Sequence, residues 1–181
     1  SPISKFTADS DEKCSPSSFP VQFNVTDSSK IGRLGDNVEM EYKWGDPLSS
    51  STNFMSTDYD TITDKWSSNF NYANYGTYTI RQIVRNNTTG CVDSSDQQVT
   101  ISKVAADFTI NLDTICLGSS ISLTDLSTTV VGNISNLSYN TTENTIGGNI
   151  DGISNYTYNN SGIQDITLTA LDENGCSGDT T

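Results

Sequence analysis

The feature that most constrains this chain is an internal repeat that spans nearly all of its 181 residues. The segment Phe6–Cys14 is matched by Phe108–Cys116, with the same spacing between phenylalanine and cysteine, and a Gly-Cys pair at 90–91 recurs at 175–176. Self-similarity along a sequence predicts structural units of one kind arranged in tandem. We therefore expect two related domains rather than one large domain.

The two copies differ in length because the first carries an insert. The offset between the copies falls from 102 residues at Phe6 and Phe108 to 86 residues at Gly76 and Gly162. Some 16 residues of the first copy therefore have no counterpart in the second. We place this insert around residues 48–66.

We divide the chain at Lys103 into domains of residues 1–103 and 104–181, with almost no linker between them. So short a connection favours a stiff head-to-tail array over a flexible tether. Few residues follow Cys176, whereas the first copy continues beyond Cys91 with a strand-like segment. We therefore expect the second domain to lack its last strand, and the chain to be a fragment of a longer repeat protein, because a missing strand would leave an open sheet edge.

The alternation of residue types inside each copy predicts β-strands. Val21, Phe23 and Val25 alternate with polar residues in the first copy, and Ile121 and Leu123 do the same in the second. Alternation with a period of two indicates strands with one buried and one solvated face. Several such strands, separated by Gly, Asn and Ser clusters, predict an all-β fold of two tandem antiparallel β-sandwiches.

Charge and composition exclude several functions. The formal net charge is −13 and the sequence pI is about 4.1, so the chain repels phosphate backbones and we expect no nucleic-acid partner. Histidine is absent, which excludes Ser-His-Asp and Cys-His catalysis and histidine-bound zinc. No stretch of the sequence approaches the ~18 apolar residues of a membrane helix, so we expect no membrane span.

The four cysteines occupy matching places in the two copies. Their even number and their symmetry predict the disulfides Cys14–Cys91 and Cys116–Cys176; the alternative is four free, buried thiols. In the chain-entropy model each bond stabilises its domain by about 4 kcal/mol. Disulfides would also place the protein outside a reducing cytosol.

These anchors resemble the polycystic-kidney-disease (PKD) repeat, a small immunoglobulin-like sandwich of extracellular proteins. That family shows a cysteine, a V-x-F-x-D-x-S strand, a W-D-F-G-D-G segment, a Y-x-x-x-G-x-Y-x-V-x-L-x-V stretch and a G-C pair. In the first copy the matching positions are Cys14, Val21–Phe23, Trp44–Asp46, Tyr72, Gly76–Ile80 and Gly90–Cys91. In the second copy they are Cys116, Ile121–Ser127, Tyr158, Gly162, Ile166, Leu168 and Gly175–Cys176.

The central segment departs from the family pattern, since it is shortened at 44–47 and replaced at 137–140. In a sandwich of this type we expect Tyr72 and Tyr158 to place their rings in the core and their hydroxyls on backbone groups. We expect Trp44 beside the disulfide of the first domain, as in immunoglobulin domains.

The cysteine-paired form of the repeat resembles domains of large secreted surface proteins in Bacteroidota-type bacteria, including gliding-motility and adhesion proteins. The resemblance implies a non-catalytic, extracellular spacer or adhesive repeat of a cell-surface adhesin or filament. Its partners would be neighbouring repeats, a surface polysaccharide or another surface protein. Two alternatives stay open: a carbohydrate- or protein-binding accessory module of a secreted hydrolase, and a strand-exchanging subunit of an extracellular fibre. We expect no catalytic residue.

The insert carries the candidate ligand sites. Asp58, Asp60 and Asp64 place three carboxylates on one short segment, and calcium takes oxygen ligands from such loops; the alternative is a solvated acidic loop. We expect no other cofactor. Tyr59 and Trp66 are the candidate contacts for a sugar or protein ligand, because aromatic rings offer a large contact area; the alternative is that the insert folds over a small core of its own.

Overall fold

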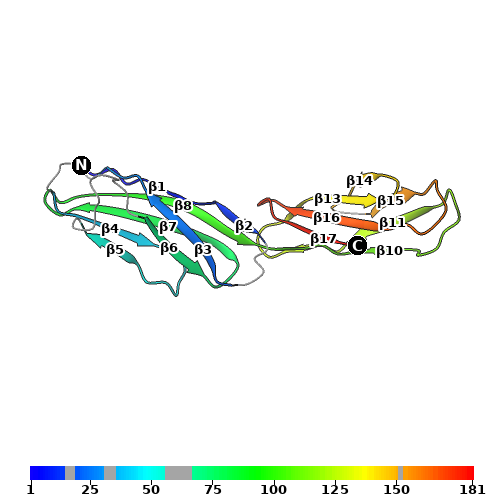
Figure 1. Ribbon diagram of the computed structural model, residues 1–181, viewed down its shortest axis with the longest axis horizontal. Coiled ribbons are helices and arrows are strands. Elements are labelled where there is room, and N and C mark those ends of the chain that lie inside the picture. The colour runs from blue at the N-terminus through cyan, green and yellow to red at the C-terminus, as the bar shows by residue number, and fades with distance from the viewer. Residues whose placement is uncertain (15–18, 31–35, 56–66, 151–152) are drawn as a thin grey trace. The chain divides into compact units, whose positions relative to one another are not determined.

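The structure, a computed structural model, describes five stretches of the chain: residues 1–14, 19–30, 36–55, 67–150 and 153–181 (Figure 1). All regular secondary structure in these stretches is β-strand. The chain forms two compact units, one ending at Ile101 and one beginning at Ser102, except that Cys14 groups with the second unit. This division falls just before the boundary expected at Lys103.

The first unit contains two sheets. The smaller sheet has three antiparallel strands, in the spatial order β1 (Phe6–Ala8), β3 (Val21–Asp27) and β6 (Ser67–Tyr72). The larger sheet has five strands, in the order β2 (Glu12–Cys14), β8 (Cys91–Ser102), β7 (Gly76–Asn86), β4 (Val38–Lys43) and β5 (Thr52–Met55). Residues of both sheets contribute to one hydrophobic core, so the unit is a β-sandwich.

The second unit repeats this arrangement. Its smaller sheet consists of β10 (Phe108–Ile110), β11 (Ser120–Asp125) and β15 (Ile153–Thr157). Its larger sheet consists of β14 (Thr145–Gly147), β13 (Ile134–Thr141), β16 (Ile166–Asp172) and β17 (Ser177–Thr180). A short two-stranded pair is formed by β9 (Val104–Ala105) and β12 (Thr128–Thr129).

The strands of the two units also correspond in register. Phe6 pairs with Asp27 across β1 and β3, and Phe108 pairs with Asp125 across β10 and β11. In both units the side chain of this aspartate accepts a hydrogen bond from the backbone amide two residues later, at 2.9 Å and 3.0 Å. The repeat in the sequence is therefore a repeat of structure, and the expected fold of two tandem immunoglobulin-like antiparallel β-sandwiches is confirmed.

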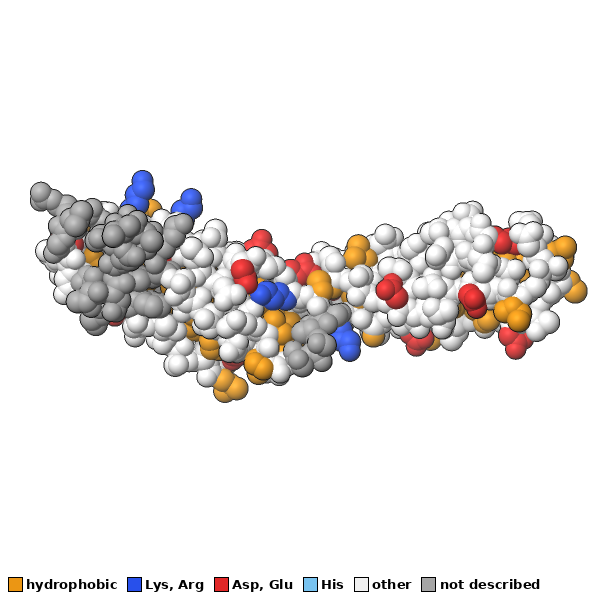
Figure 2. Space-filling view, viewed as in Figure 1, with side chains coloured by type: hydrophobic (Ala, Val, Ile, Leu, Met, Phe, Trp, Pro, Cys, Tyr) orange, Lys and Arg blue, Asp and Glu red, His pale blue; other side chains and the backbone are white. Residues whose placement is uncertain are grey.

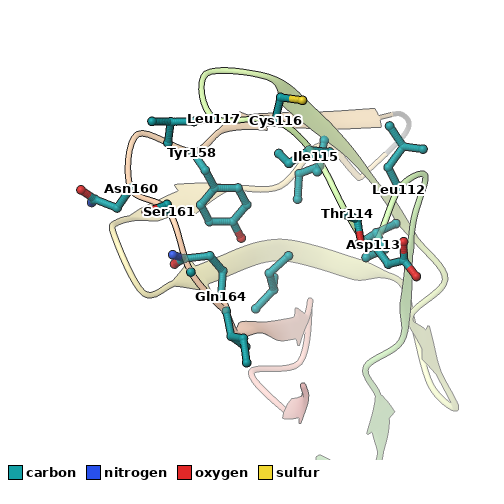
Figure 3. A pocket seen from close by; sticks show the side chains of 15 residues that line it. Leu112, Asp113, Thr114, Ile115, Cys116, Leu117, Tyr158, Asn160, Ser161 and Gln164 are labelled. Carbon is teal, nitrogen blue, oxygen red and sulfur yellow. The ribbon is translucent and has the colours of Figure 1, made fainter.

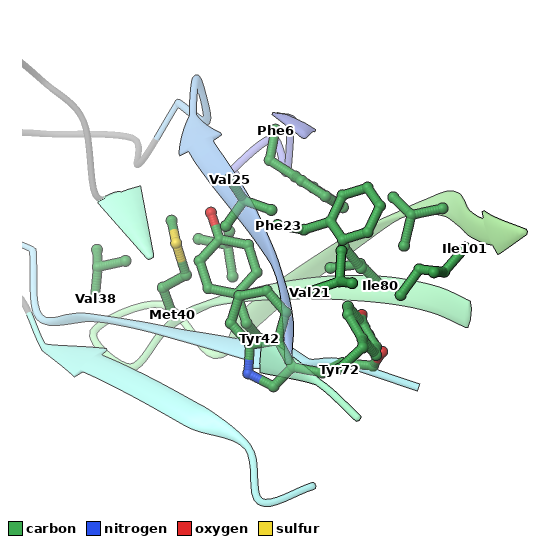
Figure 4. Packing of buried hydrophobic residues seen from close by; sticks show 13 residues of the cluster. Phe6, Val21, Phe23, Val25, Val38, Met40, Tyr42, Tyr72, Ile80 and Ile101 are labelled. Atoms are coloured by element: carbon green, nitrogen blue, oxygen red, sulfur yellow. The ribbon is translucent and has the colours of Figure 1, made fainter. Parts of the chain in front are cut away.

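Aromatic side chains fill the core of the first unit, where Figure 4 shows them between β3 and the larger sheet. Trp44 is 1% exposed and stacks on Tyr42 and Phe70, with ring centroids 5.4 Å and 5.5 Å apart. The ring of Tyr72 meets Phe23 edge-on, and its hydroxyl donates to the backbone carbonyl of Trp44 at 2.7 Å. The expected backbone contact of Tyr72 is confirmed.

A buried polar cluster lies inside this core, and the sequence did not lead us to expect it. The side-chain amide of Gln82 donates to Asp27 Oδ1 and to the Tyr42 hydroxyl, each at 2.8 Å, and its Oε1 accepts from the hydroxyls of Ser4 and Ser29. All five residues are buried. One feature could have indicated this cluster: Gln82 lies between two buried aliphatic residues on one face of β7.

The core of the second unit is smaller. Its described buried hydrophobic residues number nine, compared with thirteen in the first unit. Tyr139 is its counterpart of Tyr42, because Tyr42 pairs with Gln82 on β7 and Tyr139 with Leu168 on β16. A smaller buried apolar area gives less hydrophobic stabilisation.

The expectation of a missing last strand in the second unit needs correction. β17 pairs antiparallel with β16, from Leu168–Thr180 to Leu171–Ser177. It has four residues where β8 has twelve, so the strand is short but present. In the expected insert around 48–66, β5 lies at the edge next to β4, and β14 occupies the same place beside β13 in the second unit. Residues 56–66 lie outside the described residues.

Candidate functional site

One disulfide is present, and it differs from both bonds that the sequence predicted. Cys14 is bonded to Cys176, with Cα atoms 5.1 Å apart and a sequence separation of 162. Cys91 and Cys116 are free; the first is half-buried and the second is exposed. The predicted pairs Cys14–Cys91 and Cys116–Cys176 are therefore wrong, and so is the alternative of four free thiols.

Strand length explains why Cys14 cannot reach Cys91 in the first unit. Cys91 begins β8, opposite Asn86. The segment that leads to Cys14 pairs with the far end of β8, where the amide of Thr100 donates to the carbonyl of Asp11. Cys91 and Thr100 are separated by about 30 Å of extended strand, whereas a disulfide needs Cα atoms about 4.4–6.8 Å apart. The expectation that Trp44 lies beside a disulfide within the first domain is therefore wrong.

The same geometry separates Cys116 from Cys176 in the second unit. Cys116 lines a pocket together with Ile166, the first residue of β16. Cys176 follows the turn after Asp172, the last residue of that strand. The length of β16, about 20 Å, therefore lies between the two cysteines. In each unit the two cysteines mark opposite ends of one sandwich.

The turn that carries Cys176 is organised by Asp172, which is 1% exposed. Its Oδ1 accepts from the backbone amides of Cys176 and Asn174, both at 2.9 Å, and its Oδ2 accepts from the hydroxyls of Ser102 and Thr129 at 2.8 Å and 3.0 Å. Burial by itself would raise the pKa of Asp172, but these hydrogen bonds to the ionised form outweigh it and lower the pKa. A charged, fully paired carboxylate thus fixes the position of Cys176.

The turn that carries Cys91 is built in a similar way. Asn86 occupies the place of Asp172, and its Oδ1 accepts from the backbone amides of Thr88 and Thr89 at 3.1 Å and 3.0 Å. Gly90 precedes Cys91 with a φ of 74°, and the glycine before Cys176 has a φ of 88°. Backbone in this region favours glycine, which accounts for the Gly-Cys pair in both copies.

A pocket of about 400 Å³ opens at the end of the second unit that carries Cys116. Its walls are the connection between β10 and β11 and the connection between β15 and β16. Figure 3 shows the ring of Tyr158 standing between the Cys116–Leu117 segment and Gln164. Leu112, Leu117 and Ile163 line the pocket and are largely exposed, with Ile163 96% exposed. These exposed apolar side chains surround the opening of the pocket.

Tyr158 does not repeat the hydrogen bond of Tyr72. Its side chain is 7% exposed, and its hydroxyl has no hydrogen-bond partner among the described residues. The expected backbone contact of Tyr158 is therefore wrong. A buried polar group without a partner is rare in folded proteins, and this one lies in the wall of the pocket.

Glu143 holds one wall of the pocket in place. Its carboxylate accepts from the backbone amides of Asn159 and Asn160, at 3.1 Å and 2.6 Å, and from the hydroxyl of Tyr156 at 3.1 Å. The hydrogen bond from the Asn159 amide contributes most to lowering the pKa of Glu143, and it outweighs the opposing effect of desolvation. The connection between β15 and β16 is thereby tied to the β13–β14 turn.

A metal site receives no support from the described residues. Among them, the groups close enough together to hold an ion are Glu12, Cys14 and Cys176. The two sulfurs are bonded to each other, and only a thiolate serves as a metal ligand.

The candidate calcium ligands Asp58, Asp60 and Asp64 lie outside the described residues, as do the candidate ligand contacts Tyr59 and Trp66. Both sites stay predictions.

The surface of the second unit is acidic. Residues 104–181 include nine Asp and Glu residues and no Lys or Arg, and Figure 2 shows acidic and hydrophobic side chains distributed over it. In the part of the chain that the structure describes, no helix has the length and apolar character needed to cross a membrane.

No family model matches the sequence, and no curated protein sequence matches it. Solved β-sandwich structures are similar at a low level. The PKD domain of an M14-like peptidase from a Thermoplasmatales archaeon has 17% identity and a TM-score of 0.38, over 55% of this chain and 94% of its own. A carbohydrate-binding module from the β-sandwich superfamily, described as promiscuous in specificity, has 12% identity and a TM-score of 0.38, over 98% of this chain and 94% of its own.

β-Glucuronidase 3 from Bacteroides uniformis has 9% identity and a TM-score of 0.32, over 98% of this chain and 24% of its own. Similarities of this size assign neither a family nor a function to the chain.

Proposed function

We propose that this chain is a non-catalytic, extracellular spacer segment of a cell-surface adhesin or filament, built to resist extension. The observation that carries the proposal is the disulfide between Cys14 and Cys176. This bond joins a cysteine of the first sequence repeat to a cysteine of the second. It closes a covalent loop that contains most of the chain.

A force applied to the two ends of the chain passes through this bond. The backbone carries the force from residue 1 to Cys14, the disulfide carries it to Cys176, and the backbone carries it on to residue 181. The bond removes 162 residues from the extensible length. Fully stretched, those residues would add about 550 Å. The disulfide therefore limits extension even when both sandwiches unfold, which suits a mechanical spacer.

Two further observations support an extracellular location. A disulfide persists in oxidising compartments and is rare in a reducing cytosol. The net charge of −13 keeps the chain soluble. Both properties fit a domain that stands in the medium outside a cell.

Single-molecule stretching tests the proposal directly. The chain is attached by its two ends and pulled, first oxidised and then after reduction with dithiothreitol. We expect the oxidised chain to lengthen by no more than the short segments outside the loop, and the reduced chain to release about 550 Å more. The variant Cys91→Ser/Cys116→Ser is the matched control, because it retains the proposed bond and cannot form others.

Two results would contradict the proposal. Release of the full length by the oxidised chain would show that the bond between Cys14 and Cys176 is absent. Release of only about 150 Å by the oxidised chain would instead indicate the pairs Cys14–Cys91 and Cys116–Cys176, because two separate loops would then be locked.

A further inference from the structure

The repeat assigns the four cysteines to two types. Cys14 and Cys116 come after the first strand of their copies. Cys91 is the first residue of the last strand of the first copy, and Cys176 directly precedes the last strand of the second. The bond between Cys14 and Cys176 therefore joins a cysteine of the first type to a cysteine of the second type in the next copy. Cys116 is left as the unbonded member of the first type, and Cys91 as the unbonded member of the second.

We propose that Cys116 and Cys91 form this same bond between molecules, so that Cys116 of one chain is linked to Cys91 of a second copy of the chain. The result is a covalent head-to-tail polymer in which each junction repeats the bond between Cys14 and Cys176. The inference deepens the proposed function, on which it rests, by naming the partner of the two free cysteines.

The surroundings of Cys116 fit an interface. Cys116 is exposed at the edge of the pocket, and the apolar side chains of Leu112, Leu117 and Ile163 are exposed around it. The buried hydroxyl of Tyr158, without a partner among the described residues, lies in the same wall. An accessible thiol beside uncovered apolar surface is what a protein partner would cover.

The surroundings of Cys91 match those of the cysteine that is already bonded. Cys91 and Cys176 each follow a glycine of positive φ in a turn that closes on a side-chain oxygen, of Asn86 in one case and Asp172 in the other. Cys176, which is bonded, is fully buried, whereas Cys91 is only half-buried. Val92, the next residue, is 58% exposed. The turn at Cys91 therefore resembles the turn at Cys176, except that its cysteine is not bonded.

The chemistry needs an oxidant, which a small-molecule disulfide such as oxidised glutathione supplies. A thiolate of one chain attacks a glutathione disulfide, one glutathione leaves, and the thiolate of the second chain displaces the other. Two protein thiols are oxidised to one disulfide, and one glutathione disulfide is reduced to two glutathione thiols. The protons of the protein thiols end on glutathione.

Four forms of the 181-residue chain test the proposal: the wild type, Cys91→Ser, Cys116→Ser and the double variant. Each is incubated in a buffer of reduced and oxidised glutathione and then analysed by non-reducing electrophoresis and peptide mass mapping. We expect the wild type to form a ladder at multiples of 19.6 kDa, with Cys91 linked to Cys116 at each junction. We expect each single variant to stay monomeric.

An equimolar mixture of the two single variants provides the most specific test of the pairing between Cys91 and Cys116. One variant offers only Cys116 and the other only Cys91, so we expect the mixture to stop at the dimer. Dimers of either single variant alone, as abundant as those of the mixture, would show non-specific oxidation and overturn the proposal. A wild-type chain that stays monomeric, with both thiols open to alkylation, would overturn it as well. Peptide mapping of the bond between Cys14 and Cys176 in each sample tests the proposed function separately, because that function requires this bond whether or not Cys91 and Cys116 pair.

Discussion

Replacement of Asp172 by alanine should destabilise the second unit and loosen the turn that holds Cys176. Asp172 is buried and accepts four hydrogen bonds. The hydroxyls of Ser102 and Thr129 can turn to the carbonyl of Val131, which both already contact. For the backbone amides of Asn174 and Cys176, the described residues offer no such substitute. Loss of the acceptor for the buried amide of Cys176 and the half-buried amide of Asn174 costs about 3 kcal/mol in total, so we expect the unfolding free energy to fall by about that amount.

Hydrogen exchange followed by mass spectrometry measures this loss, because the second unit contains no tryptophan to report its unfolding. A loss of this size predicts about 10²-fold faster exchange in β16 and β13. The matched control is Asp172→Asn, which copies the residue that Asn86 provides in the first unit and should cost about 1 kcal/mol. Exchange in β16 that stays at the wild-type rate in Asp172→Ala would refute the role assigned to the carboxylate.

The same carboxylate makes stability depend on acidity. The pKa of Asp172 is lowered in the folded state, below the unfolded value of about 3.9. Its stabilising contribution is therefore complete above that value and is lost as the pH falls through the folded pKa. Asp172→Asn should lack this acid-dependent component, and the difference between its acid denaturation curve and that of the wild type measures it.

Three further comparisons follow from the structure. Tyr72→Phe should lower the unfolding free energy by about 1–2 kcal/mol, because it removes the hydrogen bond to the carbonyl of Trp44. Tyr158→Phe should not lower it, because the Tyr158 hydroxyl has no partner among the described residues. Urea denaturation of both variants checks this. Gln82→Leu should lower the unfolding free energy by about 4 kcal/mol, because the buried carboxylate of Asp27 loses the hydrogen bond from Gln82. The control Gln98→Leu, at an exposed position, should lower it by less than about 0.5 kcal/mol. Tryptophan fluorescence measures both. The lowered pKa of Glu143 predicts that, in an NMR titration, the amide signals bonded to it move only below the pH at which a free glutamate titrates.

The fold could be predicted because its signals are local. The alternation of Val21, Phe23 and Val25 with polar residues required a strand with one buried face, and β3 buries those three side chains. The equal spacing of phenylalanine and cysteine in the two copies required equal structures, and β1–β3 and β10–β11 share one register. Each inference depended on the period of side chains along one strand, which neighbouring residues fix.

The polar features of the structure could not be predicted in the same way. Gln82 is a polar residue in an apolar strand, and only the packing of the two sheets brings Asp27, Ser4 and Ser29 to its amide. Tyr72 and Tyr158 occupy the same place in the repeat, yet the Tyr72 hydroxyl donates to a backbone carbonyl, whereas the Tyr158 hydroxyl has no partner in the described part of the chain. A hydrogen bond depends on tenths of an ångström between segments far apart in sequence, and a motif does not encode them.

The sequence by itself determined that this chain is all-β, that it contains two copies of one sandwich, and that its cysteines fall into two matching types. Only the tertiary structure decided which cysteines are joined. Among the described residues, five strands (β3, β4, β5, β6 and β7) lie between Cys14 and Cys91, and each crosses the sandwich once. An odd number of crossings leaves the two cysteines at opposite ends, too far apart for a bond. The disulfide therefore forms between cysteines of different copies, where the two sulfurs meet in space.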